Sequence, residues 1–240
     1  MGFITNVKHA LVVGGNGAIS QAVIQQLLMH ETLQTLYIIA QNAPNTVDSR
    51  VIWLPGRITT ANMNDLVAPI ERPIHFVFIG TGILMGQQYR PEKKLNHITQ
   101  AGLNEIFSIN TFGPIHLIQA LEPYLCFDYL RIGVVSAKIG SITDNHRGGW
   151  YGYRASKAAL NMMLKTLAIE WGRLNQNIAI IALHPGTVDS PLSKPFQKNI
   201  PDAQLKTPQQ SGKHLLAIID QSQPKDSGQL FDWSGNILPY

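Results

Sequence analysis

Cysteine and charge are both scarce in this chain of 240 residues. The single cysteine, Cys126, cannot form a disulfide within the chain, which fits a reducing compartment. Charged residues make up 14% of the sequence, whereas an average domain has about 25%, and hydrophobic residues make up 45%. This balance excludes a disordered chain and predicts a domain with a large buried core.

The sequence also lacks the patterns of membrane, nucleic-acid and metal sites. No stretch approaches the roughly 20 apolar residues of a membrane span, and no apolar run follows a basic N-terminal region. The net charge is +4, but the Lys and Arg residues are scattered rather than clustered as in nucleic-acid binders. The eight histidines show no ligand spacing, so we expect no metal. We therefore expect a cytoplasmic protein that binds neither membranes nor nucleic acid.

Short apolar runs rich in Val and Ile alternate with amphipathic segments along the whole chain. The runs lack the alternation of half-exposed strands, as expected for strands buried on both faces. This order predicts one Rossmann-type, doubly wound α/β domain over residues 1–240, with a parallel sheet of about seven strands and helices on both faces. The expected strands are 10–13, 36–40, 51–54, 75–79, 130–135, 178–183 and 229–231, and the expected helices are 18–29, 62–70, 102–121, 151–174 and 208–220.

One irregular stretch, about 185–207, is too long for an ordinary connection and contains four prolines. It follows the carboxyl end of a predicted strand, where open α/β sheets bind their ligands. We expect a substrate lid there; an ordered surface loop is the alternative.

A glycine-rich turn joins the first predicted strand to the first predicted helix. Glycines let backbone N–H groups approach a pyrophosphate, and the helix N-terminus adds a partial positive charge. The pattern predicts dinucleotide binding by Gly14, Asn16, Gly17, Ala18 and Ile19. In dinucleotide-binding folds, a side chain at the end of the second strand contacts the cofactor ribose. Gln41 occupies this position here, rather than a carboxylate or an arginine. Because no carboxylate repels a 2′-phosphate, we expect NADP, with NAD possible.

Tyr153 and Lys157 are four residues apart in a predicted helix, so their side chains share one face. A nearby ammonium favours the phenolate and lowers the pKa of a phenol, which can then exchange a proton with a substrate oxygen. A surface Tyr–Lys pair without a function is the alternative. Tyr151 lies six residues from Lys157 and is expected to form a wall of the site.

Taken together, these motifs resemble the short-chain dehydrogenase/reductase family. The resemblance rests on the glycine turn at 14–20, Asn110 in the run Ser-Ile-Asn-Thr-Phe-Gly-Pro, the Tyr153–Lys157 pair and Pro185-Gly186. Segments 140–145, 148–151 and 184–188 are similar to the C-factor (C-signal-like) and Sniffer-type carbonyl reductase branch, as is 228–233.

The resemblance implies roles for these residues. Tyr153 would be the general acid in carbonyl reduction, Lys157 would lower its pKa and bind the nicotinamide ribose, and Asn110 would hold a water linked to Lys157. Further cofactor contacts would come from Gly80, Thr81, Gly82, Pro185, Gly186 and Val188. Relatives form dimers or tetramers through the helices predicted at 102–121 and 151–174, so a homodimer or homotetramer is expected.

Several positions depart from the family pattern. Ala18 and Ser20 replace two glycines of the turn, and Gly80 replaces an asparagine. The usual catalytic serine falls on Ala137, so we expect its neighbour Ser136 to serve the substrate oxygen, with Ser141 as the alternative.

Two functions follow from this pattern. The first is an oxidoreductase that transfers a hydride between NADP(H) or NAD(H) and a carbonyl or secondary alcohol. The alternative is a cofactor-binding signalling or interaction protein with little or no catalysis, which the altered turn and Ala137 motivate.

Overall fold

The computed structural model of the chain describes residues 7–59, 61–198, 201 and 204–240. Their central element is a sheet in the order β10-β9-β6-β5-β4-β1-β2-β3, in which every pairing is parallel except that of β10 with β9. The order reverses beside β1, as in the predicted doubly wound fold. The strands are β1 (His9–Val13), β2 (Thr35–Ala40), β3 (Val51–Pro55), β4 (Phe76–Ile79), β5 (Leu130–Val135), β6 (Ile178–His184), β9 (Leu230–Asp232) and β10 (Ile237–Leu238).

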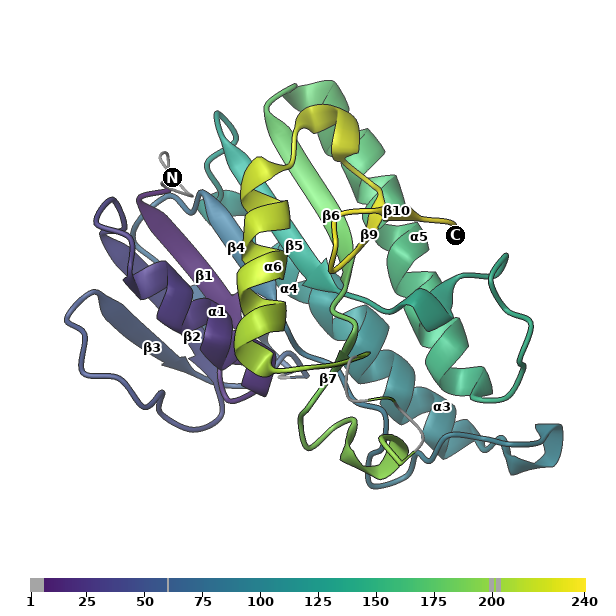
Figure 1. The fold of residues 1–240 in the computed structure, drawn as a ribbon. Coiled ribbons are helices and arrows are strands. Elements are labelled where there is room, and N and C mark those ends of the chain that lie inside the picture. The colour runs from purple at the N-terminus through teal and green to yellow at the C-terminus, as the bar shows by residue number, and fades with distance from the viewer. Residues whose placement is uncertain (1–6, 60, 199–200, 202–203) are drawn as a thin grey trace.

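Helices cover both faces of this sheet (Figure 1). One face packs against α1 (Ala18–Leu28) and α6 (Pro208–Gln221), and the other against α2 (Met63–Val67), α4 (Gly113–Leu121) and α5 (Tyr151–Leu174). Alternate strand residues therefore enter separate cores: Val12 and Phe78 lie in the first, Leu11 and Val77 in the second. Burial on both faces explains the unbroken apolar runs of these strands.

The helix predicted at 102–121 is wrong as a single α-helix. The structure has α3 (Gln100–Phe107), a π-helical turn (Ser108–Phe112) and then α4. Pro114 has no backbone N–H and its ring crowds the carbonyl four residues earlier, that of Asn110. The turn widens at this point, and such π-helical turns are frequent at functional sites.

The sheet also has one strand more than the sequence indicates. β10 pairs antiparallel with β9 through Ile237–Phe231 and Leu238–Leu230. Its two residues are too few to form a recognisable strand pattern. In the described part of the chain no helix is both long and apolar enough to cross a membrane.

The predicted lid segment contains local structure. β7 (Thr187–Val188) pairs with β8 (Leu205–Lys206), and a 3₁₀ turn (Lys194–Phe196) lies between them. Residues 199–200 and 202–203 of the segment lie outside the described residues.

Candidate active site

Two adjoining cavities lie at the carboxyl ends of the parallel strands, and Gly80 and Gly82 line both. The first has a volume of about 290 Å³ and lies beside β1, β2 and β4. The second has a volume of about 490 Å³ and lies between the ends of β5 and β6 and the segment 184–196. The predicted site residues that line the first are Gly14, Asn16, Gly17, Gln41, Gly80, Thr81 and Gly82; those that line the second are Ile19, Gly80, Gly82, Ser136, Tyr153, Lys157, Pro185, Gly186 and Val188.

The glycine turn borders the first cavity. Gly14 has a φ of 77°, and a Cβ there would lie 2.6 Å from Oγ1 of Thr81, so only glycine fits. Gly17 caps α1, and the predicted Ala18 is the first residue of that helix rather than a lining residue. Asn16 holds the turn against the end of β2, because its side chain donates to the carbonyl of Asn42 (3.2 Å) and accepts from its N–H (3.0 Å). Backbone donors of a helix N-terminus therefore face this cavity.

Ser20, which replaces a glycine of the family pattern, fits tightly against another glycine. Its hydroxyl donates to the carbonyl of Val13 (3.3 Å), and the residue is buried. A Cβ on Gly80 would lie 2.2 Å from the Ser20 Oγ. The serine therefore occupies space that a side chain at position 80 would need.

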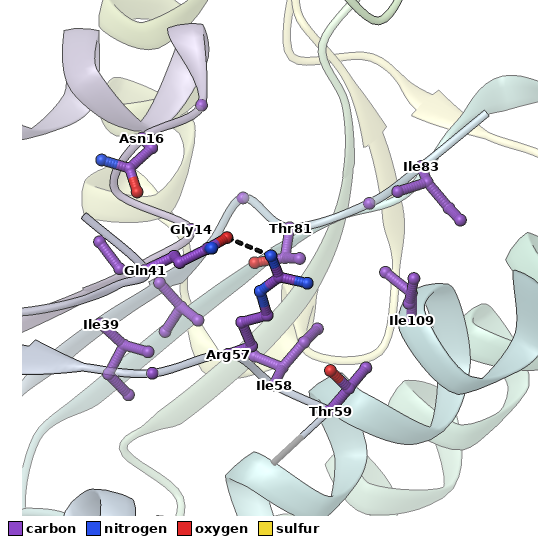
Figure 2. Close-up of a pocket in the computed structure, with 16 residues that line it drawn as sticks. Gly14, Asn16, Ile39, Gln41, Arg57, Ile58, Thr59, Thr81, Ile83 and Ile109 are labelled. Carbon is purple, nitrogen blue, oxygen red and sulfur yellow. Dashed lines mark hydrogen bonds between the residues drawn. The ribbon is translucent and has the colours of Figure 1, made fainter. Parts of the chain in front are cut away.

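Arg57 is a cation at this cavity that the sequence analysis did not single out. Its guanidinium donates to Oε1 of Gln41 across the ends of β2 and β3 (Figure 2). It is the one charged residue among those that line the first cavity in the described part of the chain. The hydroxyl of Thr81 in the same lining is buried without a hydrogen-bond partner among the described residues. Such an unpaired buried hydroxyl is costly unless a ligand pairs with it.

Tyr153 and Lys157 both line the second cavity, as their helical spacing predicts. The Lys157 ammonium is buried and donates to the carbonyl of Val135 at the end of β5 (2.9 Å). Burial raises the pKa of Tyr153 to about 12 and lowers the pKa of Lys157 to about 8. The sequence predicts a lowered pKa for this tyrosine, whereas burial of the phenol raises it.

Asn110 lies behind this pair, in the π-helical turn. Its Oδ1 accepts from the N–H of Ile83 (2.8 Å), and its Nδ2 donates to the carbonyl of Ile83 (2.9 Å) and to Oγ of Ser156 (3.4 Å). A Cβ on Gly82 would lie 3.3 Å from the Lys157 Nζ and 3.4 Å from the Asn110 Oδ1. The asparagine therefore fixes the strand end after β4 next to the ammonium.

The two candidate serines lie in different surroundings. Ser136 lines the second cavity, but its hydroxyl donates to Oδ1 of Asn161 (2.6 Å). Ser141 does not line that cavity; its Oγ accepts from the N–H of Asp144 (3.2 Å) and stabilises the loop after β5. The structure thus brings Ser136 together with Tyr153 and leaves Ser141 outside.

The N-terminus of α5 is held by residues that the sequence interpretation missed. The buried Glu92 carboxylate accepts from the N–H of Gly152 (3.2 Å to each oxygen) and from the hydroxyl of Tyr89 (2.9 Å). That hydroxyl in turn accepts from the N–H of Tyr153 (3.0 Å). A carboxylate at a helix N-terminus pairs with free backbone donors and complements the helix dipole. Glu92 is 60 residues from Gly152, so no local motif could reveal it.

Comparisons with known proteins agree with this geometry. The family model described as short chain dehydrogenase matches residues 8–201. C-signal of Myxococcus xanthus is 33% identical over 147 residues, which are 61% of this chain and 83% of that protein. A 1-hydroxy-2-glutathionyl-2-methyl-3-butene dehydrogenase of a Rhodococcus species is 35% identical over 132 residues, 55% of this chain and 56% of that protein.

Solved structures share the fold. An NADPH-bound carbonyl reductase from chicken fatty liver has a TM-score of 0.83 at 22% identity, covering 98% of this chain and 99% of its own. The carbonyl reductase Sniffer of D. melanogaster has the same TM-score and identity, covering 98% of this chain and all (100%) of its own. At these identities the likeness establishes the architecture alone.

Proposed function

The chain belongs to the short chain dehydrogenase family, and on that premise we propose that it is an oxidoreductase that reduces a carbonyl group with NADPH, or oxidises the alcohol in reverse. The family predicted from the sequence is confirmed by the match over residues 8–201, and the C-signal relative agrees with the predicted branch. One observation carries the proposal: Tyr153, Lys157 and Gly82 line the same cavity, and this cavity adjoins the glycine turn. Asn110 fixes the position of Gly82 beside the Lys157 ammonium.

The residues of the first cavity fit a dinucleotide. The bare backbone at Gly14 and Gly17 lets a phosphate approach the start of α1, and the unpaired Thr81 hydroxyl suits a ribose oxygen. Lys157, Pro185, Gly186 and Val188 would hold the nicotinamide end in the second cavity. Arg57 and the absence of a lining carboxylate among the described residues favour NADPH over NADH.

When bound, NADPH supplies a hydride to the carbonyl carbon. Tyr153 donates its phenolic proton to the carbonyl oxygen, so the products are an alcohol and NADP⁺. The charged Lys157 stabilises the phenolate that remains, and Asn110 supports the relay that returns a proton to it. Ser136 orients the substrate oxygen once its hydroxyl turns from Asn161 into the cavity.

A cofactor-binding protein with little catalysis is the second candidate. It is supported by the Ser136 hydroxyl, which donates to Asn161, and by the Tyr153 phenol, whose pKa burial raises to about 12. The name of the C-signal relative also points to signalling.

A matched pair of tyrosine variants separates the two candidates. We would titrate the protein with NADPH and NADH by fluorescence and then measure NADPH oxidation with a panel of aldehydes, ketones and quinones. The wild type is expected to turn over some of these carbonyls, and Tyr153→Phe to lower kcat at least about a hundredfold. The control, Tyr151→Phe, changes an exposed ring that does not line the second cavity, contrary to the wall expected from the sequence, and it should retain activity. Tight NADPH binding without any turnover would establish the second candidate instead.

We also propose a homo-oligomer and a cytoplasmic location. α5 exposes 66% of Met162 and 50% of Ile169, which lie two turns apart on one helical face. A partner helix would cover this face, and Ile169→Arg is then expected to shift the sedimentation coefficient to that of a monomer. The single cysteine supports the cytoplasmic location.

The segment 185–207 is proposed as the lid because its residues 185–188, 190, 192, 193 and 196 line the second cavity.

A further inference from the structure

Several residues that line the second cavity have no role in the proposed binding of the cofactor. The volume of this cavity, about 490 Å³, lies within the range of sites that enclose a whole small molecule. These other lining residues include the apolar Leu84, Ile139, Trp150, Leu192 and Phe196, the cation Arg147, and the hydroxyl-bearing Thr187, Ser190 and Ser193. No acidic residue lines the cavity in the described part of the chain.

Trp150 is held in an unfavourable backbone conformation at this wall. Its φ of 54° and ψ of 45° are left-handed, which costs a bulky residue about 1–2 kcal/mol. Two hydrogen bonds maintain it: its N–H donates to the carbonyl of Glu92 (2.6 Å), and its carbonyl accepts from the N–H of Arg154 (2.9 Å). Strain of this kind is characteristic of ligand sites.

Two aromatic rings, those of Trp150 and Phe196, lie together beside the Tyr153 acid. The indole of Trp150 meets the ring of Phe196 edge-on (centroids 5.0 Å apart, 63°) and that of Tyr153 (6.1 Å, 74°). A flat substrate ring would gain the same edge and face contacts here. The wall therefore favours an aromatic group next to the reacting carbonyl.

One exposed cation, Arg147, lines the second cavity. The neighbouring Arg154 does not line it and donates to the carbonyls of Gly149 (3.0 Å), Gly148 (3.2 Å) and Ile139 (3.3 Å). Asp144 pairs with Lys138 (3.5 Å) and acts electrostatically on Arg154, whereas no ion pair among the described residues contains Arg147. The Arg147 guanidinium can thus pair with an anion, and it suits a carboxylate because it binds both oxygens.

We propose that the substrate is an aromatic carbonyl compound that carries a carboxylate. Its ring packs against Trp150 and Phe196, and its carboxylate pairs with Arg147. This rests on the proposed function: the carbonyl carbon gains the hydride of NADPH, the oxygen gains the proton of Tyr153, and the carboxylate is unchanged.

A matched pair of substrates tests the proposal. We would compare 3-(4-formylphenyl)propanoate with its methyl ester, because the saturated chain insulates the aldehyde from the charge. The expected kcat/KM is about five- to tenfold higher for the acid, as for a partly exposed charge-assisted pair. Arg147→Gln should lower kcat/KM for the acid to the value for the ester. Arg173→Gln, which removes an exposed charge at the far end of α5, should preserve the preference.

Binding gives a second readout that does not depend on turnover. We would measure the affinities of the two corresponding alcohols for the NADP⁺-loaded protein by calorimetry. Tighter binding of the acid that depends on Arg147 and weakens with salt supports the proposal, even if neither aldehyde is reduced and the proposed function fails. Equal kcat/KM for acid and ester in an active enzyme would overturn the proposed substrate class and leave the proposed function intact. Equal binding of the two alcohols would have the same consequence.

Discussion

Replacement of Glu92 by glutamine tests whether a distant carboxylate positions the acid of the site. The carboxylate accepts from Gly152 and from the hydroxyl of Tyr89, which in turn accepts from Tyr153. A glutamine retains one acceptor oxygen but turns an NH₂ group towards a donor. One charge-assisted bond is lost and one buried donor is left unpaired, at a cost of about 2 kcal/mol.

For a chain of this length, that loss lowers the melting temperature by about 4–8 °C. The start of α5 also loosens, so Tyr153 is placed less accurately and kcat is expected to fall about tenfold. The affinity for NADPH should stay the same, because the glycine turn lies elsewhere. Calorimetric scans, NADPH titration and steady-state rates measure the three quantities.

The control for this experiment is Glu31→Gln, which removes an exposed carboxylate in the turn between α1 and β2. Tyr89→Phe should reproduce most of the effect, and the double variant should lose much less than the sum, because the two side chains form one network. A Glu92→Gln protein as stable as Glu31→Gln, or more stable, would refute the reasoning. The burial cost of the charge would then outweigh its hydrogen bonds.

Four further predictions follow from the site. Arg57→Gln should weaken NADPH binding about five- to tenfold in a fluorescence titration and leave NADH binding unchanged, since the exposed guanidinium would pair with the 2′-phosphate that NADH lacks. Carbonyl reduction should decline as pH rises through about 8, where Lys157 loses the charge that stabilises the phenolate; a flat kcat profile would contradict this. His184 is held neutral because burial lowers its pKa from 6.5 to about 4, so the unfolded chain binds more protons and about 3 kcal/mol of stability is lost as pH falls across that interval. Denaturant unfolding should show a smaller loss for His184→Gln. Ser136→Ala should reduce kcat about tenfold and Ser141→Ala should not; equal effects would reject the role of Ser136.

The sequence predicted those parts of the fold that local pattern determines. Strand 130–135 and helix 151–174 have the predicted bounds, because apolar runs and a long amphipathic repeat carry that information directly. The break in helix 102–121 had a local signal in Pro114, the proline at the end of the run Ser-Ile-Asn-Thr-Phe-Gly-Pro. β10 had none, since two residues paired with β9 show no periodicity.

Some residues of the candidate site could likewise be predicted from local spacing, and others could not. Tyr153 and Lys157 are neighbours along one helix, and their common placement follows from spacing. Glu92 and Arg57 act through contacts with residues far along the chain, so their surroundings required coordinates. The raised pKa of Tyr153 differs from the expectation for the same reason, because burial is a property of the folded chain.

The close fit of Ser20 against Gly80 changes the meaning of two departures from the family pattern. Considered separately, the serine in the glycine turn and the missing asparagine after β4 each suggest that the cofactor-binding site is impaired. The structure places them against each other, with room for one side chain between them. The Ser20 side chain fills space that an asparagine at position 80 would need. A side chain at position 80 would therefore require glycine at position 20 as well as a shift of the Phe78 ring, which lies 2.8 Å from the same Cβ position, whereas Ser20 can be replaced by glycine alone.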